Sequence, residues 1–505
     1  MVRIRPPRIL TAVAVAFLAL GAGLGLAQSP DRLVVAQGTD VASLDPQMQN
    51  DTFSRSALSN IFDTLIYRDA DLELVPGLAT AWRNVDDTTW DLDLREGVTF
   101  HDGTPFGPED VKFSLERPLD ESLGSPLASR FSVIDRVEVT GDSSVRVHTS
   151  LPYPLLPARL SEWFMVSKAY VESNDGATVA AEPVGTGAYA FVDWVKDDRL
   201  TLEAYEDHWR GAPDIQEVVF RPIPELSTRV AALQAGDVDL VTNVPAIRTS
   251  AVESDPNLDL QSIPSTYIQY VALDGTQNEA LSDPRVRQAI QYATNVDEII
   301  EFLFDGNAVE IGVPLAHGTF GLNEDLEPYP YDPERARALL AEAGYPDGIR
   351  FELDAPVGRY AQDKEVAEAL VGQWAQVGIE VDLNINDWSV QLSKYRANEL
   401  ADAHYMGWGT STFDADDILW GGFARQPTKN NYENPRVTEL VNEARATFDD
   451  ARRAELYAEV QEIIHEELPW LILFQQVDLY GVRSDLDWTP RPDGKIEART
   501  ITVAE

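Results

Sequence analysis

Segments with strand-like and helical patterns alternate along the whole chain, which restricts it to an α/β or mixed architecture. Two helices are predicted where an Asp cap precedes Pro at the first helical position, at Asp283-Pro284 and Asp332-Pro333. Their apolar faces are Val286, Ala289, Ile290 and Ala293 in the first helix, and Ala336, Leu339, Leu340 and Ala343 in the second, which Gly344 closes. A chain of 505 residues exceeds what one hydrophobic core can hold, so we expect at least two domains.

Residues 1–27 have the composition of an export signal, with arginines ahead of an apolar run from Ile9 to Leu20. Small residues near Ala27 offer a cleavage site, so the mature chain is predicted to begin at Gln28. An uncleaved membrane anchor is the less favoured alternative, because the run is shorter than the roughly 20 residues that span a bilayer. The chain has no cysteine, hence no disulfide and no lipid-anchor thiol, and we expect it to be free in a periplasm.

The chain is strongly acidic, with 84 acidic and 40 basic residues and a formal net charge of -44. This charge excludes nucleic acid as a partner, because a phosphate backbone would be repelled. Lysine is scarce among the basic residues. Because acidic, lysine-poor surfaces hydrate strongly, we predict a salt-adapted protein. Melting temperatures measured at rising salt concentration test this hypothesis, and a steady decrease would contradict it.

No pattern in the chain identifies a metal site, a cofactor or a catalytic group. The six histidines show no paired ligand spacing on any predicted helix, so we expect no metal and no cofactor, although a chelated metal complex could be carried as cargo. The sequence has no G-x-S-x-G elbow, zinc motif or phosphate-binding glycine loop. We therefore expect a protein that is not an enzyme. A secreted glycoside hydrolase is the alternative, since so many carboxylates include pairs that could serve one.

One segment of the chain says more about the protein's class than its composition does. From Leu94 to Val111 the chain reads L-R-E-G-V-T-F-H-D-G-T-P-F-G-P-E-D-V. Local physics predicts that Leu94, Val98 and Phe100 end a strand, that a turn follows, and that Pro108 begins a helix.

This segment resembles L-R-x-G-V-x-F-H-D-G-x-P-x-x-x-x-D-V of the extracytoplasmic solute-binding proteins that supply peptide, nickel and opine ABC importers. Further landmarks of that family follow in order: Leu44-Asp45-Pro46, Asn60 to Leu65, Pro76-Gly77-Leu78-Ala79, Pro183 to Tyr189, His208-Trp209-Arg210-Gly211 and Ala235 to Asp239. Both Asp-Pro helices also match. The resemblance therefore covers essentially the whole mature chain.

The resemblance implies an α/β fold of the large, type II periplasmic-binding-protein class, a two-lobed clamp with an extra subdomain inserted in the first lobe. The predicted parts are lobe I in residues 28–58, 185–270 and 475–505, the inserted subdomain in 59–184, and lobe II in 271–474. The chain would cross between lobes near Tyr270–Asp274 and near Phe474–Asp478, in strand-like runs. The protein would be a monomer that traps a small-molecule or peptide ligand and delivers it to ABC transporter permease subunits.

Arg359 is the first predicted ligand residue. It lies in a loop after a strand and before a helix predicted to start near Asp363, where its planar guanidinium can bind a carboxylate. Peptide-binding relatives use an arginine in this region for the ligand's carboxylate. Tyr360 is predicted to pack on the ligand body. Gly38 and Thr39 follow the first predicted strand, Leu33 to Ala36, in a turn that lines the cleft of relatives. The alternative for Gly38 and Thr39 is a plain turn that ends the strand, and the alternative for Arg359 is a surface arginine paired with a nearby acid.

A second group of predicted ligand residues follows a strand near Tyr405. Its members are aromatic or small and polar: Tyr405, Trp408, Gly409, Ser411, Thr412 and Asp414. Core packing is the alternative for Tyr405. Ser411 stands where many dipeptide-binding relatives have an Asp for the ligand's amine, a role that Asp414 could take over. The loop instead resembles G-W-x-x-S-T-G-x-A-D of glutathione-binding members, with Phe413 in place of the second Gly.

The implied function is therefore capture of a short peptide or a peptide-like anion, such as a dipeptide, glutathione or an opine. Because this chain has Ser411 where relatives have an acidic residue, we expect weaker binding of ordinary peptides. The ammonium group of such a peptide would lack a partner in the closed cleft. An oligosaccharide-binding member of the same family is the alternative, because tryptophans can stack on sugars.

Overall fold

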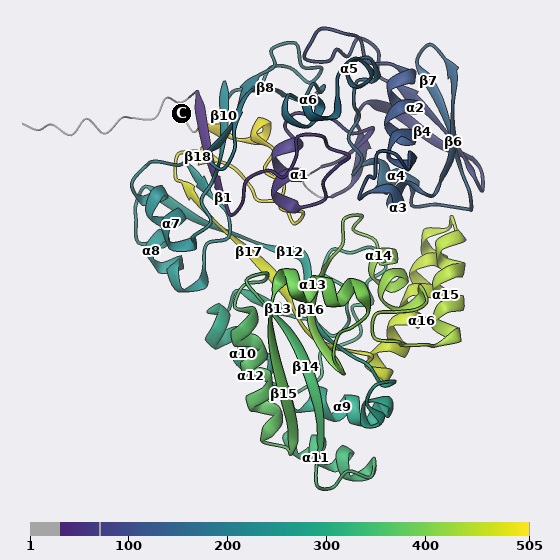
Figure 1. Cartoon of the computed structure of the whole chain (residues 1–505), viewed down its shortest axis with the longest axis vertical. Coiled ribbons are helices and arrows are strands. Elements are labelled where there is room, and N and C mark those ends of the chain that lie inside the picture. Colours follow the sequence, from purple (N-terminus) through teal and green to yellow (C-terminus); the bar gives the residue numbers. More distant parts are fainter. Residues whose placement is uncertain (1–30, 70–71, 504–505) are drawn as a thin grey trace, which may run out of the picture.

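The computed structural model describes residues 31–69 and 72–503, and it has two lobes, one above the other in Figure 1. The predicted signal peptide, residues 1–27, lies outside the described residues. A sheet of 11 strands passes through both lobes in the order β15-β14-β16-β12-β17-β11-β1-β10-β9-β8, with β13 beside β17. The predicted α/β clamp is confirmed. None of the helices in the described part of the chain has both the length and the apolar surface of a transmembrane span.

The first lobe surrounds β1 (Arg32–Gln37), which confirms the predicted first strand. Leu33 and Val35 are buried on the face covered by α1, whereas Val34 and Ala36 are buried against α7 on the opposite face. The other elements of this lobe are α1 (Thr52–Leu58), β8 (Tyr189–Val195), β9 (Arg199–Ala204), β10 (Glu217–Pro222), α7 (Leu226–Gln234), β11 (Leu240–Val241), η2 (Ala246–Arg248), α8 (Thr249–Glu253), β18 (Leu486–Asp487), η5 (Ala498–Thr500) and β19 (Thr502–Val503).

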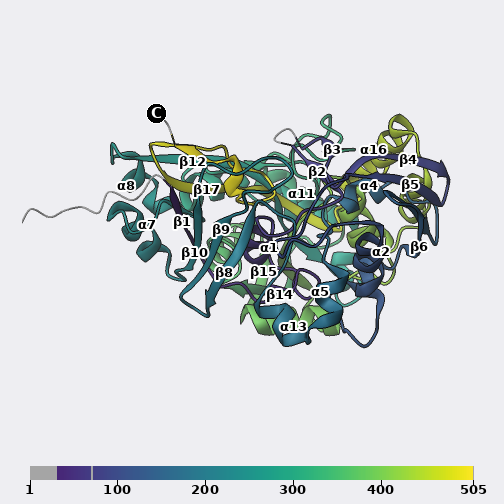
Figure 2. The same ribbon diagram turned by 90° about the horizontal axis from the view of Figure 1, so that it is seen from above.

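A separate sheet in the order β4-β5-β7-β6 forms the core of the additional subdomain. Figure 2 shows β4, β5 and β6 on the opposite side of the molecule from β1 and β10. The elements here are β2 (Ile66–Arg68), β3 (Leu74–Pro76), β4 (Ala79–Asp86), β5 (Thr89–Leu94), α2 (Pro108–Glu116), η1 (Arg117–Leu119), α3 (Ala128–Phe131), β6 (Ile134–Gly141), β7 (Ser144–Thr149), α4 (Leu156–Leu160), α5 (Lys168–Ser173) and α6 (Gly176–Ala181). The residue bounds predicted for this subdomain and for the lobes stay predictions.

The segment that revealed the resemblance joins this subdomain to the first lobe. Pro108 begins α2 as predicted, but β5 ends at Leu94. The prediction that Val98 and Phe100 belong to the strand is wrong, because both follow a turn and are buried in the subdomain core. The ring of His101 bonds to the carbonyl of Gly187 at 2.9 Å.

Gly187 and Gly185 require their small size at this junction. A Cβ on Gly187 would meet the carbonyl oxygen of Asn60 at 2.5 Å, and one on Gly185 would meet that of Ile61 at 2.0 Å. The family landmarks around these residues therefore determine how two parts of the fold meet.

The second lobe has helices on both faces of its part of the sheet. Along β12, Val271 and Leu273 face one core, whereas Tyr270 and Ala272 face the other. The elements are η3 (Glu279–Ser282), α9 (Pro284–Tyr292), α10 (Val296–Phe304), β13 (Ala308–Glu310), α11 (Pro333–Glu342), β14 (Ile349–Val357), α12 (Asp363–Ala375), β15 (Ile379–Asp387), α13 (Trp388–Ala397), β16 (Ala403–Gly409), α14 (Asp416–Ile418), η4 (Leu419–Ala424), α15 (Pro435–Ala446) and α16 (Asp450–Glu467).

The two Asp-Pro helix starts are confirmed as α9 and α11, with Asp283 and Asp332 as caps. The predicted apolar face of α9 is fully buried, and that of α11 is buried except for Ala343, which is partly buried. Gly344 follows α11 with a φ of 98°, a conformation that favours glycine at this helix end.

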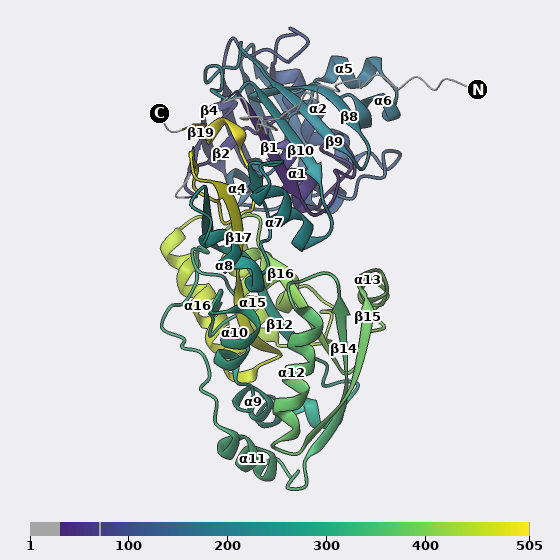
Figure 3. The ribbon, with the colours of Figure 1, turned by 90° about the vertical axis from the view of Figure 1, so that its left-hand side faces the viewer.

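Two long strands, β12 (Leu258–Leu273) and β17 (Trp470–Arg483), lie side by side and pass between the lobes (Figure 3). Their antiparallel register breaks between Pro264 and Ile268, opposite Gln475 to Val477. Within the predicted crossing Phe474–Asp478, residues Phe474 to Gln476 pair with β13 of the second lobe, and a crossing in this segment stays a prediction. The crossing predicted at Tyr270–Asp274 is wrong by a few residues, because Tyr270 already pairs with β16 inside the second lobe.

Two carboxyl groups near this crossing have raised pKa values, Glu310 on β13 and Asp478 on β17. Burial raises the pKa of Glu310 to about 7 and that of Asp478 to about 6. At a pH below these values and above the pKa of an ordinary carboxyl, the folded protein holds protons that the unfolded chain releases. The contribution of these two groups to the free energy of unfolding should therefore decrease as the pH rises from about 5 to about 8.

We predict that Glu310→Gln flattens this decrease, as measured by urea unfolding across the same pH range. Glu301→Gln, on the exposed side of α10, is the matched control and should leave the slope unchanged. Equal slopes for Glu310→Gln and the unmodified protein would contradict the prediction.

Candidate functional site

A cleft opens between the lobes, with about 580 Å³ of empty space that includes open solvent. Its lining residues come from both lobes and from the crossing strand: Asn50, Thr52, Arg55, Arg130, Glu162, Thr266, Tyr267, Gly409, Thr410, Ser411, Asp493 and Lys495. Asn50 and Thr52 lie at the start of α1, whereas Gly409 ends β16. A molecule bound here would contact both lobes and the crossing strand.

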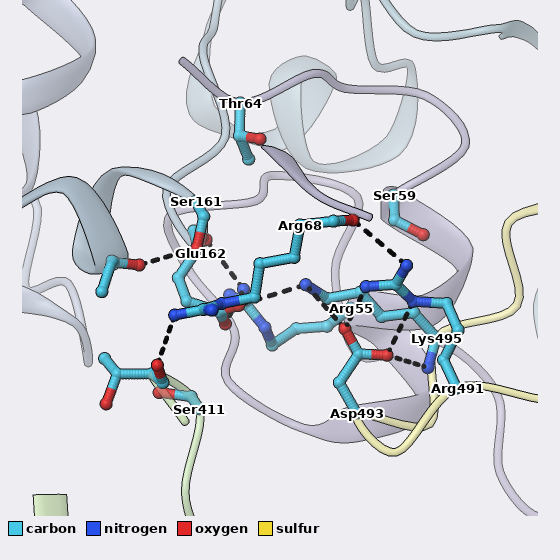
Figure 4. Close-up of polar contacts among 12 residues, drawn as sticks. Arg55, Ser59, Thr64, Arg68, Ser161, Glu162, Ser411, Arg491, Asp493 and Lys495 are labelled. Atoms are coloured by element: carbon cyan, nitrogen blue, oxygen red, sulfur yellow. Dashed lines mark hydrogen bonds and ion pairs between the residues drawn. The ribbon is translucent and has the colours of Figure 1, made fainter. Parts of the chain in front are cut away.

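The two carboxylates that line the cleft are both paired with cations (Figure 4). Glu162 accepts from Arg55 at 2.9 Å and from Lys495 at 3.1 Å. Asp493 pairs with Arg491 at 2.9 Å. Burial alone would raise the pKa of Glu162, but Lys495 and Arg55 lower it below its ordinary value. Both groups are therefore ionised and neutralised within the protein.

Arg130 on α3 lines the same cleft without such a partner. Within the described residues, its guanidinium makes no ion pair or hydrogen bond. Burial, together with the nearby charges of Arg159 and Arg55, lowers the pKa of Arg130. The cleft therefore contains a half-buried positive charge that lacks a counterion.

Asp417 on α14 holds the loop that follows β16. One carboxylate oxygen accepts hydrogen bonds from the hydroxyls of Thr410 and Thr412, at 3.2 and 3.0 Å, and from the backbone N–H of Ser411 at 3.2 Å. The other oxygen pairs with Arg159 of α4. Burial would raise the pKa of Asp417, but Arg159 and Thr412 lower it. Asp417 thus fixes the loop of the second lobe and ties it to the first.

Contacts at Thr412, Phe413 and Asp414 also hold this loop. Phe413 has a φ of 55°, which is uncommon for a bulky residue. This backbone conformation explains why the similar loop of glutathione-binding members has a glycine at the position of Phe413. The guanidinium carbon of Arg68 lies 5.0 Å from the Phe413 ring, and Arg68 donates to the carbonyl of Thr412. Asp414 is buried and pairs with Arg453 at 2.6 Å.

Arg359 lies just beyond β14 at the edge of the cleft. Its guanidinium carbon is 5.1 Å from the ring centre of Tyr360, 5.4 Å from that of Trp388 and 5.8 Å from that of Tyr267, which lines the cleft. The Tyr360 hydroxyl donates to the carbonyl of Gly407 at 3.3 Å. Arg359 is exposed and, within the described residues, pairs with no carboxylate. Three aromatic rings therefore position a guanidinium that is open to a ligand.

Of the residues predicted around β16, Gly409 and Ser411 line the cleft. Trp408 is partly buried, with its indole against Gly421 and 6.0 Å from the ring of Trp470. Tyr405 is fully buried in the core of the second lobe, the alternative foreseen for it. Direct contacts of Tyr405, Thr412 and Asp414 with a ligand stay predictions, and their protein partners favour a supporting role.

The predicted residues of the first strand's turn lie elsewhere. Gly38 is close to Phe53 and to Arg229, and Thr39 is exposed. In the described part of the chain, neither residue is among those that line the cleft. Their proposed contact with a ligand stays a prediction.

Sequence reasoning missed six lining residues with charged or aromatic side chains: Arg55, Arg130, Glu162, Tyr267, Asp493 and Lys495. Tyr267 could have been found, because it lies only a few residues before the predicted crossing. The three cations have no local pattern, since they are more than 70 residues apart and only the fold brings them together.

Comparison with known proteins identifies the architecture around this cleft. The family model for bacterial extracellular solute-binding proteins, family 5 Middle, matches residues 73–430, more than half of the chain. The chain belongs to this family.

Its relatives include a glutathione-binding protein of Pectobacterium atrosepticum, 31% identical over 87% of this chain and 88% of that protein. Among solved structures, a periplasmic binding protein associated with an ABC transporter of Helicobacter pylori, in complex with the peptide STSA, has a TM-score of 0.80 and 28% identity, covering 94% of this chain and 98% of that one. A binding protein of A. tumefaciens R10 in complex with agropinic acid has a TM-score of 0.79 and 27% identity, covering 94% and 99%. The predicted family and type II fold are confirmed.

Proposed function

We propose that this protein is the periplasmic solute-binding component of an ABC importer and captures a short peptide or a peptide-like anion. Family membership supports the role of solute binding, and the cleft between two lobes suits a clamp that closes on its cargo. The relatives that bind glutathione, the peptide STSA and agropinic acid support a peptide-like solute. Delivery to membrane permease subunits completes the role.

The charge balance of the cleft is the observation that supports an anionic solute. Its lining carboxylates are neutralised by protein cations, whereas Arg130 and, at the edge, Arg359 have no carboxylate partner. A positive group on a solute would find no free carboxylate among these lining residues, but a carboxylate would find a guanidinium.

Individual residues have proposed roles that follow from this arrangement. Arg359 binds a carboxylate of the solute, Tyr360 and Trp408 border its body, and Gly409 and Ser411 offer polar contacts from the end of β16. Thr412, Asp414 and Tyr405 maintain the shape of that wall.

Native mass spectrometry of the protein purified from a periplasmic extract tests the proposal, followed by calorimetric titration with a dipeptide, glutathione and mannopinic acid. We expect at least one of these solutes to bind and to be recovered chemically unchanged. Exclusive binding of a neutral oligosaccharide would replace the proposal with its alternative. Hydrolysis of a bound solute would instead indicate an enzyme.

A further inference from the structure

The environment of Arg130 narrows the class of solute, an inference that rests on the proposed function. Arg130 comes from α3 of the additional subdomain, and it lines the cleft together with Gly409 at the end of β16. Near it are Arg55, which pairs with Glu162, and Arg159, which pairs with Asp417. Each neighbouring cation thus has its own carboxylate, and the charge of Arg130 is the one left uncompensated among these three.

An uncompensated guanidinium that is half-buried loses hydration without gaining a partner. The chain has twice as many acidic as basic residues, so a carboxylate for Arg130 would be easy to supply from within the protein. Its absence at a cleft wall is therefore best explained by an anion that arrives with the solute. The surrounding positive charges that lower the pKa of Arg130 also favour such an anion.

Arg359 provides a second cation at the edge of the same cleft. It belongs to the second lobe, whereas Arg130 belongs to the first, and Tyr267 on the crossing strand borders both the cleft and Arg359. Thr52, Thr266 and Thr410 line the cleft as well. A threonine hydroxyl can accept or donate a hydrogen bond, and that of Thr410 already donates to Asp417. A solute held across the cleft would thus meet one free guanidinium from each lobe.

We propose that the cleft selects peptide-like solutes with two carboxylates, one bound by Arg130 and the other by Arg359. γ-Glutamyl peptides such as glutathione have this chemistry, because the γ-linkage leaves the α-carboxylate free in addition to the C-terminal one. Each lobe contributes one arginine, so a solute with both groups stabilises the closed clamp more than a solute with one.

Calorimetric titration with three matched ligands tests this proposal on the full mature protein. The ligands are glutathione, its ethyl ester at the glycine carboxylate, and γ-aminobutyryl-cysteinyl-glycine, which lacks the α-carboxylate. We expect glutathione to bind at least about 10-fold more tightly than either analogue, as for a charge-assisted contact. Arg130→Gln should abolish the preference over one analogue, and Arg359→Gln the preference over the other.

The controls separate binding from folding. Arg136→Gln removes an exposed arginine from β6 of the same subdomain and should leave all three affinities within about twofold of the unmodified protein. Arg130→Lys keeps the charge without the planar fork, and it serves as a second variant if Arg130→Gln does not fold. Thermal unfolding of each variant checks the fold directly.

An unchanged preference for glutathione over both analogues in Arg130→Gln would overturn the inference and leave the proposed function intact. Failure of the unmodified protein to bind glutathione, together with binding of a single-carboxylate dipeptide, would have the same consequence. If no peptide and no opine binds, the proposed function fails as well.

Discussion

Asp417→Asn is expected to weaken solute binding by about 30-fold or more, because it removes the charge that ties the lobes together in the closed clamp. Asp417 and Arg159 are both largely buried, with side-chain exposures of 12% and 13%. Removing one partner of such a pair leaves the other charge buried and alone, which costs on the order of 2 kcal/mol or more. Since this pair spans the two lobes, the cost falls on the closed state, and apparent affinity decreases with it.

Two further variants separate the roles of Asp417. Arg159→Gln removes the contact between lobes but keeps the hydrogen bonds that Asp417 accepts from Thr410 and Thr412. It should lower affinity less than Asp417→Asn does, and small-angle scattering without ligand should show a more open molecule for both. Asp382→Asn disrupts an exposed ion pair within the second lobe and should have little effect. Affinity within about twofold of the unmodified protein in Asp417→Asn would contradict the expected role.

Local sequence patterns predicted the elements that are determined by short-range physics. The starts of α9 and α11 followed from an Asp cap and a Pro, and the helix at Asp363 followed from the loop that precedes it. The crossing in β12 was predicted at Tyr270–Asp274, a few residues too far along the chain. A break in pairing register depends on the partner strand, so no local pattern in this segment indicates it.

The cleft itself was only partly predictable. Among the predicted residues, Gly409 and Ser411 line the cleft and Arg359 lies at its edge. A family pattern marks the loops of all three, and these loops follow the ends of strands. Arg130 and Asp417 were not found, because their importance depends on which charges the fold brings near them. Asp414 was the acid considered as a replacement for the one missing at Ser411, yet Asp414 pairs with Arg453. The N–H of Ser411 is instead bound to Asp417, a carboxylate six residues further along the chain.

Arg359→Ala is expected to reduce affinity for an anionic peptide by about 30-fold, corresponding to a cost on the order of 2 kcal/mol for a lost charge-assisted contact. The reason is that Tyr360, Trp388 and Tyr267 hold the guanidinium in place, so little conformational entropy is lost when a carboxylate binds. Arg359→Lys should retain part of the affinity, because its ammonium keeps the charge but not the planar fork.

The matched control for this prediction is Arg350→Ala, which removes an exposed arginine from β14 that pairs with Asp382. Because this pair lies within one lobe and on its surface, affinity should stay within about twofold of the unmodified protein. Calorimetric titration of all three variants with the same peptide provides the comparison. If Arg359→Ala behaved like Arg350→Ala, the solute's carboxylate would have to be bound elsewhere, and Arg130 would be left as the free cation of the cleft able to bind it.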